Sequence, residues 1–225
     1  NPPWAGGFTW SKDKDGRDWI AVSCEGEGAR IWWPNKDHIT AEGDSVRMAY
    51  TVPSNLVAVG NGKLRSIKKS DDKTTYEWFV QNPINNYNIS VQIGNYVAVQ
   101  DTFKKDDTTH FMDHYVLDYN KQLASNYFPQ SKEIIRFYEK YFGDYQWYND
   151  GYKLVEVPYL GMEHQSAVTY GNGFSIYNGV RSKSWPMYGV IDPLIIHETG
   201  HEWFGNSVTA SDPTHIWIHE GLQVY

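Results

Sequence analysis

The chain has 225 residues, of which 40% are apolar, and this is enough material to pack one large domain or two smaller ones. Its formal net charge of −7 at pH 7, without a sustained Lys/Arg cluster, argues against nucleic acid or an anionic membrane surface as a partner, because both require a basic face. Cys24 is the only cysteine, which excludes an intramolecular disulfide and a cysteine-based metal site, and no apolar run approaches the roughly 18 residues of a membrane span.

The first part of the chain, residues 1–110, has the composition of a β-rich domain. Short runs of β-branched and aromatic residues are separated by Gly, Asn and Pro, a pattern typical of strands joined by turns. Strands are expected at Asp18–Cys24, Val46–Val52, Thr75–Val80 and Ile89–Gln100. The polar segment 70–73 is expected to be a solvated hairpin tip without a functional role.

Beyond about residue 118 the apolar period changes from that of strands to that of a helix. Apolar residues recur at helical spacing from Leu123 to Phe142, and Gly143 is placed to end the helix. Pro129 should kink or split it. The change of period puts a domain boundary near residue 110, so we predict an α+β fold divided into residues 1–110 and 111–225.

The last third of the chain is expected to contain two short strands and two helices. The strands are predicted at Lys153–Val157 and Ser166–Tyr170. The helix starts are marked by Asp followed by Pro, at Asp192-Pro193 and Asp212-Pro213. Each pair combines an N-cap side chain with a proline at the first helical position, where its missing N–H costs nothing.

The helix after Pro193 contains the motif HETGH at residues 197–201, inside an apolar pattern that Gly205 should close. Residues four apart on a helix differ by about 40° in direction, so His197 and His201 point to one side and can reach a single metal ion at roughly 2.0–2.1 Å. Glu198 lies about 100° from His197 and can approach a water on the metal from the side. Its expected role is therefore general base.

A catalytic zinc site of this type needs a third protein ligand and an open position for water. Glu220, separated from His201 by 18 residues, is the expected third ligand on the next helix, with one zinc ion per chain. For the motif alone, a buried helix with merely hydrogen-bonded histidines is an equally good interpretation. The burial, the Asp-Pro helix starts and Glu220 favour the metal site. Surface or core roles are expected for the other histidines: His38, His110, His114, His164, His215 and His219.

The stretch HETGHEWFGNSVT at residues 197–209, followed by WIHEG at 217–221, closely resembles the zinc aminopeptidases typified by aminopeptidase N and leukotriene A4 hydrolase. These enzymes are gluzincins, and the resemblance implies a zinc-dependent aminopeptidase built on the ligands named above. It also implies a saddle-like β domain followed by the first half of a thermolysin-like catalytic domain. The family's catalytic Tyr and C-terminal helical domain lie beyond the 225 residues, so we expect these residues alone to have little or no peptidase activity.

Further upstream, residues 161–164, Gly-Met-Glu-His, are similar to the family's Gly-x-Met-Glu-Asn exopeptidase motif. The sequence departs from that motif at Leu160, where the family has Gly, and at His164, where it has Asn. The resemblance implies that Glu163 binds the free α-amino group of a peptide substrate. It also implies that backbone groups near Gly161 and Met162 hold the substrate strand.

The β-rich part resembles the family more loosely, through residues 24–37, which are similar to its Pro-Cys-x-Asp segment. Family members can place an additional amine-binding polar residue near this segment. Lys36 falls close to that position, but a cation cannot bind an ammonium group, so Lys36 is assigned no role. The site implied by the resemblance therefore consists of the zinc ligands, Glu198, Glu163 and the nearby backbone.

We therefore predict hydrolysis of the N-terminal peptide bond of peptides with a free amine. Zinc would polarise the scissile carbonyl and lower the pKa of a water molecule, and Glu198 would accept the proton of that water and pass it to the leaving amine. Two alternatives stay open: an endopeptidase or bifunctional epoxide hydrolase with the same zinc site, and a non-catalytic binding module. The intact Glu198 speaks against the last. The sequence assigns neither localisation nor oligomeric state.

Overall fold

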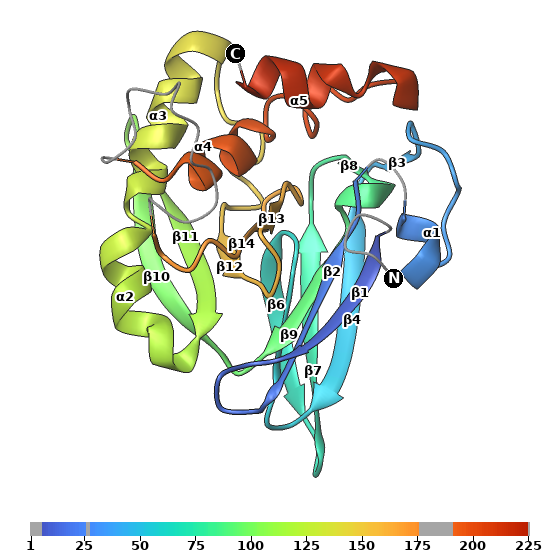
Figure 1. Cartoon of the computed structure of the whole chain (residues 1–225), viewed down its shortest axis with the longest axis vertical. Helices are drawn as coiled ribbons and strands as arrows, with labels where there is room; N and C mark the ends of the chain where they lie inside the picture. The colour runs from blue at the N-terminus through green and yellow to red at the C-terminus, as the bar shows by residue number, and fades with distance from the viewer. Residues whose placement is uncertain (1–5, 26–27, 176–190, 225) are drawn as a thin grey trace.

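The computed structural model describes residues 6–25, 28–175 and 191–224. Figure 1 shows the strands of the N-terminal part in the lower half of the view and helices above and beside them. The fold is of the predicted α+β class. Gly26 and Glu27, which belong to the segment that loosely resembles the family, lie outside the described residues. No helix in the described part of the chain is long and apolar enough to cross a membrane.

Three sheets make up the β-rich part that precedes residue 95. The four-stranded sheet has the order β1-β2-β9-β5 and contains β1 (Gly7–Lys12), β2 (Asp18–Ser23), β5 (Val57–Gly60) and β9 (Val91–Gly94). The three-stranded sheet has the order β4-β7-β6 and contains β4 (Val46–Pro53), β6 (Lys63–Lys69) and β7 (Lys73–Val80). The smallest sheet pairs β3 (Glu42–Gly43) with β8 (Ile84–Asn85), and the short helices are α1 (Ala29–Trp32) and the 3-10 turn η2 (Asn86–Asn88).

The strand β7 shows why these residues form sheets. Every second side chain along it is buried, as expected for a strand with one face against the core. Trp78 lies on that face, and its indole Nε1 donates a hydrogen bond to the carbonyl of Ala58 at 3.0 Å. The predicted hairpin tip joins β6 to β7, where the Ser70 N–H donates to the carbonyl of Lys73 at 2.8 Å.

A five-stranded sheet of order β10-β11-β12-β14-β13 forms the second part of the structure. Its strands are β10 (Tyr96–Lys105), β11 (Thr108–Leu117), β12 (Leu154–Glu156), β13 (Gly161–Met162) and β14 (Val168–Tyr170). Residue 110, where the sequence places the domain boundary, lies inside β11, and the sheet takes strands from both sides of it. The division into 1–110 and 111–225 therefore stays a proposal about how the chain is organised.

The single strand predicted at Ile89–Gln100 is two strands in the structure. The chain leaves β9 at Gly94, passes Asn95 and enters β10 at Tyr96, so β9 pairs within the four-stranded sheet and β10 within the five-stranded sheet. An unbroken apolar run cannot show this change of partner, because pairing depends on the tertiary arrangement.

The predicted long helix is split at Pro129, as expected. It consists of α2 (Lys121–Tyr127) and α3 (Gln130–Phe142), with the 3-10 turn η3 (Asp118–Asn120) before them. Pro129 is the N-cap of α3, and Gly143 follows its last residue with a φ of 92°, the left-handed region that favours glycine. The buried side of α3 joins the core cluster that also contains Phe128, Tyr170 and Ile195.

Of the two predicted Asp-Pro helix starts, one is confirmed and one is corrected. Asp192 caps α4 (Pro193–Gly200) by accepting a hydrogen bond from the Leu194 N–H at 2.8 Å, although regular helix ends at Gly200 and only turns continue to Gly205. Asp212 instead caps the 3-10 turn η4 (Pro213–His215), and the ligand-bearing helix α5 (Trp217–Val224) begins after it. A cap motif specifies a helical turn but not whether that turn continues as an α-helix.

Candidate metal centre

The helices α4 and α5 bring the three expected zinc ligands together. The Nε2 atoms of His197 and His201 are 3.2 Å apart. The carboxylate oxygens of Glu220, on α5, lie 3.4 Å from the first imidazole and 3.5 Å from the second. No other residue contributes to this three-membered cluster in the part of the chain that the structure describes.

These three separations are close to those of a tetrahedral zinc site, although the two Glu220 separations involve different carboxylate oxygens, Oε2 with His197 and Oε1 with His201. Ligand atoms bound at about 2.0–2.1 Å in tetrahedral directions are separated by roughly 3.3–3.4 Å. The observed separations of 3.2, 3.4 and 3.5 Å scatter around that value. Two imidazoles and one carboxylate are also the donor set that catalytic zinc takes, with one position left for water. The residues present therefore fit the metal.

The imidazole of His201 is held in the form that binds a metal. Its Nδ1 lies 2.9 Å from the carbonyl of Phe204, so Nδ1 carries the proton and Nε2 keeps a free lone pair. Burial lowers the pKa of His201 to about 3, and the neighbouring His197 adds to this effect. Burial also lowers the pKa of His197. Both imidazoles are therefore neutral at neutral pH, as metal ligands must be.

A close contact between α4 and α5 sets the position of Glu220. Nε2 of Gln223, one turn beyond Glu220, donates to the carbonyls of Ile196 and His197, and Oε1 of Gln223 accepts from the hydroxyl of Tyr138 at 2.8 Å. The helices approach this closely because residue 200 is glycine: a Cβ there would lie 2.0 Å from Gln223 Oε1. Sequence reasoning missed Gln223, because nothing local distinguishes it from an ordinary helix residue.

The two functional acids of the prediction, Glu198 and Glu163, are both buried beside the metal cluster. Together with His201 they form a second group of donor atoms that lie within 4.8 Å of one another. Glu198 lies against Gly161, where a Cβ would come within 2.5 Å of its Oε1. Glu163 is 2% exposed, and its Oε1 has no hydrogen-bond partner among the described residues.

Burial raises the pKa values of both carboxyl groups well above their usual range. Mutual repulsion adds to the rise, because each acid feels the charges of Glu25 and Glu220, and Glu198 also feels Glu163. A cation in this place reverses the effect by favouring the charged carboxylates. The site is therefore built to receive positive charge.

Glu25 is an acid near the site that sequence reasoning missed. It follows β2, and its negative charge raises the pKa values of Glu163, Glu198 and Glu220. The resemblance suggests an amine-binding residue near this segment, and Lys36 is the residue that falls close to that position. Lys36 is exposed. The negative charge of Glu25 is the signal that could have identified it in the sequence, because an ammonium group binds an acid.

The remaining buried histidines lie outside the metal cluster. His114 Nδ1 accepts from the Leu154 N–H at 2.9 Å, and His219 Nε2 accepts from the Ala210 N–H at 2.9 Å. His164 is fully buried, its Nε2 lies 3.2 Å from the carbonyl of Val22, and burial lowers its pKa to about 4. These rings are core residues with backbone partners.

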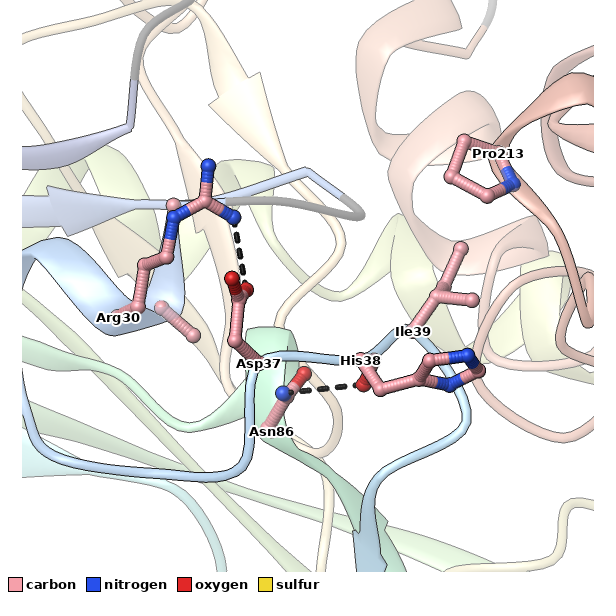
Figure 2. A pocket seen from close by; sticks show the side chains of 8 residues that line it. Arg30, Asp37, His38, Ile39, Asn86 and Pro213 are labelled. Atoms are coloured by element: carbon pink, nitrogen blue, oxygen red, sulfur yellow. Dashed lines mark hydrogen bonds and ion pairs between the residues drawn. The ribbon is translucent and has the colours of Figure 1, made fainter.

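Figure 2 shows a separate pocket of about 160 Å³ next to the η4 turn that leads into α5. Its lining comprises Gly28, Ala29, Arg30, Asp37, His38, Ile39, Asn86 and Pro213. Arg30 pairs with Asp37 at 2.7 Å, and Asn86 Nδ2 donates to the carbonyl of His38 at 3.3 Å. None of the proposed metal ligands lines this pocket. It marks where the N-terminal part meets the segment that carries Glu220.

The α+β fold, the cluster of two histidines and one glutamate, and the buried glutamate beside it are the features expected of a gluzincin metallopeptidase. Residues 127–225 match the family model described as "Peptidase family M1 domain". Together with the similar proteins described next, this match confirms the resemblance to the zinc aminopeptidases.

Several curated relatives are similar to almost the whole chain. Leucyl aminopeptidase of Saccharolobus solfataricus is 23% identical over 218 residues, which are 92% of this chain and 26% of that protein. Tricorn protease-interacting factor F2 of Thermoplasma volcanium is 25% identical and covers 97% of this chain and 27% of its own length. Glutamyl aminopeptidase of Rattus norvegicus is 24% identical and covers 95% of this chain and 22% of its own length. The chain thus spans about a quarter of the length of these relatives.

Solved structures confirm the fold. A variant M1 zinc metallopeptidase from Deinococcus radiodurans, bound to a Tyr-Ser-Ala substrate, superposes with a TM-score of 0.77 at 18% identity, covering 100% of this chain and 48% of that one. The M1 zinc metallopeptidase from the same organism gives a TM-score of 0.75 at 19% identity, covering 96% of this chain and 46% of that one. At this identity the likeness concerns the fold.

Gly200→Ala is expected to weaken zinc binding by about tenfold or more, because the added Cβ pushes Gln223 and with it α5 away from α4. Isothermal titration with zinc measures the affinity. Gly221→Ala is the matched control: it also places a Cβ beside Glu220, but the nearest atoms lie at 3.8 Å, so the affinity should stay within about twofold. Equal affinities for the two variants would contradict this account of how α5 is held.

Zinc should stabilise the chain more at neutral than at acid pH. Burial raises the pKa of Glu220 from 4.5 to about 7, so without metal this group's contribution to stability is present at low pH and is lost as the pH rises through about 7. Zinc favours the charged carboxylate and offsets that loss. The rise in Tm on adding zinc, measured by differential scanning fluorimetry, should grow between about pH 5 and about pH 7.5. His201→Ala, which removes a ligand, is the control, and an equal zinc effect at both pH values would refute the assignment.

Proposed function

We propose that this protein is a zinc-dependent aminopeptidase that binds one zinc ion per chain through His197, His201 and Glu220. The observation that carries the proposal is the combination of a ligand triangle of zinc dimensions with a buried, unpartnered carboxylate oxygen on Glu163 beside it. The first feature supports metal-assisted hydrolysis, and the second supports a site for an ammonium group. Zinc, when bound, polarises the scissile carbonyl and makes a water molecule a nucleophile at neutral pH.

Glu198 is the general base in this proposal. It directly follows a proposed metal ligand on α4, its carboxylate packs against Gly161, and one of its oxygens lies within 4.8 Å of a ring nitrogen of His201. Glu198 is 6% exposed and lies close to other carboxylates, and both effects raise its pKa. The raised pKa makes it a better proton acceptor than an exposed glutamate. Glu198 accepts a proton from the attacking water and delivers it to the amine that leaves.

Glu163 and Glu25 bind the free amine of the substrate. An N-terminal residue differs from an internal one only in its ammonium group, so an aminopeptidase needs a fixed anion at a set distance from the metal. Glu163 comes from the segment after β13, and Glu25 comes from the segment after β2. Their charges add at one place, which favours an ammonium group over a neutral acetylated amine.

The strand β13 orients the substrate backbone. Among the described residues it is the end strand of the five-stranded sheet and pairs only with β14, through Gly161 and Met162. An extended peptide can add to such an edge by main-chain hydrogen bonds. Because Glu198 packs against Gly161, a peptide on this edge lies next to the general base.

The alternatives use the same residues in other ways. An endopeptidase would need the zinc ligands and Glu198 but not the buried acid at Glu163, whose desolvation is costly without a cationic partner. A bifunctional epoxide hydrolase would keep the aminopeptidase site and use it for a second reaction. A binding module would need no base. The arrangement of Glu163 and Glu25 favours the aminopeptidase.

Glu198→Gln in the full-length gene product should keep one zinc per chain and lower kcat by about 10²- to 10⁴-fold, because the amide preserves shape but accepts no proton. Steady-state kinetics on an alanyl anilide and metal analysis by mass spectrometry measure the two effects. Activity within a few-fold of the parent would show that another group is the base.

Glu163→Gln should raise KM for peptides with a free amine by about ten- to a hundredfold, because it removes a charge-assisted contact, while zinc content stays unchanged. The parent should cleave N-acetylated peptides poorly from the start. Paired assays with a free and an acetylated tripeptide give both numbers. Efficient cleavage of the acetylated peptide would replace the aminopeptidase proposal with the endopeptidase alternative.

A further inference from the structure

Glu202 is a buried acid next to the proposed metal ligand His201, and neither metal binding nor the proposed chemistry uses it. It is 1% exposed. A buried carboxylate is costly unless it is hydrogen-bonded, so its partners indicate what it does. These partners lie in the turn that carries Glu163.

Both carboxylate oxygens of Glu202 are engaged. Oε1 accepts a hydrogen bond from the backbone N–H of Ser166 at 2.8 Å, and Oε2 accepts one from Nδ2 of Asn206 at 3.3 Å. The same Nδ2 donates to the backbone carbonyl of Glu163 at 2.8 Å. The backbone N–H of Asn206 in turn donates to the carbonyl of His201 at 2.9 Å. Both ends of the turn 163–166 are thus tied to the segment that carries a metal ligand.

The opposite side of the turn is held by Lys153 and by Gly62 of the β-rich part. Nζ of Lys153 donates to the carbonyls of Ser166 at 2.9 Å and Gly62 at 2.6 Å, and the Gly62 N–H donates to the hydroxyl of Ser166 at 2.9 Å. Ser166 has a φ of 59°, a left-handed conformation that residues other than glycine rarely adopt and that these contacts maintain. The turn can therefore not move relative to the metal site without breaking several buried hydrogen bonds.

We propose that Glu202 is a positioning residue that fixes the distance between the metal site and Glu163 and so selects substrates whose ammonium group lies one Cα from the scissile carbonyl. The proposal rests on the proposed aminopeptidase function. A β-amino acid inserts one more methylene between these groups. When the turn holds Glu163 at one distance from the metal site, Glu163 can bind the α-amine but is misplaced for the β-amine. A misplacement of about 1 Å can cost about a hundredfold in rate.

The test compares alanyl and β-alanyl p-nitroanilides in the full-length, zinc-loaded gene product. Glu202→Ala removes both contacts, whereas Glu202→Gln keeps an acceptor for Ser166 but presents an NH₂ group to the Nδ2 of Asn206. In the Ala variant KM for the alanyl substrate should rise about tenfold or more, and the ratio of kcat/KM values for the two substrates should fall at least about tenfold. The Gln variant should lie between the Ala variant and the parent, and zinc content should stay at one per chain.

Glu156 offers a matched control. It is also buried, at 7% exposure, and it also accepts from one backbone N–H, that of Leu117 at 2.9 Å, and from one asparagine side chain, that of Asn120 at 2.7 Å. It does not contact the turn. Glu156→Ala should lower Tm but leave the substrate ratio unchanged. If the Glu202 variants lower activity on both substrates in proportion, the residue is merely structural and the proposal is wrong.

Failure of the proposed function has a different signature, namely a parent protein that cleaves neither substrate or a Glu163→Gln variant that keeps the preference for free amines. Calorimetric binding of L-alanine and β-alanine to the zinc-loaded protein gives the same comparison without turnover. If Glu202→Ala does not fold, the nearly isosteric Glu202→Gln variant serves as the test. An unchanged selectivity in that variant, by kinetics or by calorimetry, overturns the proposal.

Discussion

The short separations among the donor groups of three residues, His197, His201 and Glu220, are the constraint on which the rest of the structure depends. Polar groups held together away from water are costly unless a cation or hydrogen bonds satisfy them. The surroundings supply rigid support for this arrangement. Asp192 caps the helix that carries the imidazoles, and Gln223 joins α5 to that helix. The zinc-type geometry is thus a property of how two short helices are held.

The features that could be predicted from the sequence are those with a local cause. Helical periodicity places His197, in α4, and His201, its C-cap, on one side, and the structure shows their Nε2 atoms in contact. Proline chemistry likewise predicts the break at Pro129 and the cap at Asp192, because both effects act within one turn of helix. Glu220 was found by its spacing, and α5 brings it to the imidazoles.

The features that could not be predicted depend on contacts between distant segments. The chain crosses from one sheet to another at Asn95, inside the segment predicted as one strand, and Asp212 caps a 3-10 turn where the start of an α-helix is expected. Glu25 reaches the site from the N-terminal part. Glu202 carries no local signal either, because its role follows from the turn it contacts. Each of these is set by tertiary packing, which overrides local propensity.

The distribution of the site along the chain has a consequence for the order in which it assembles. Two donors, His197 and His201, are four residues apart and come together as soon as α4 forms. The acids arrive from farther away, and Glu25 and Glu220 are separated by 220 − 25 = 195 positions. Contacts between neighbours in sequence form before those that close long loops. A cation that binds the imidazole pair early is therefore in place before the carboxylates come near one another. Its positive charge then screens the repulsion between the carboxylates as each one reaches the site.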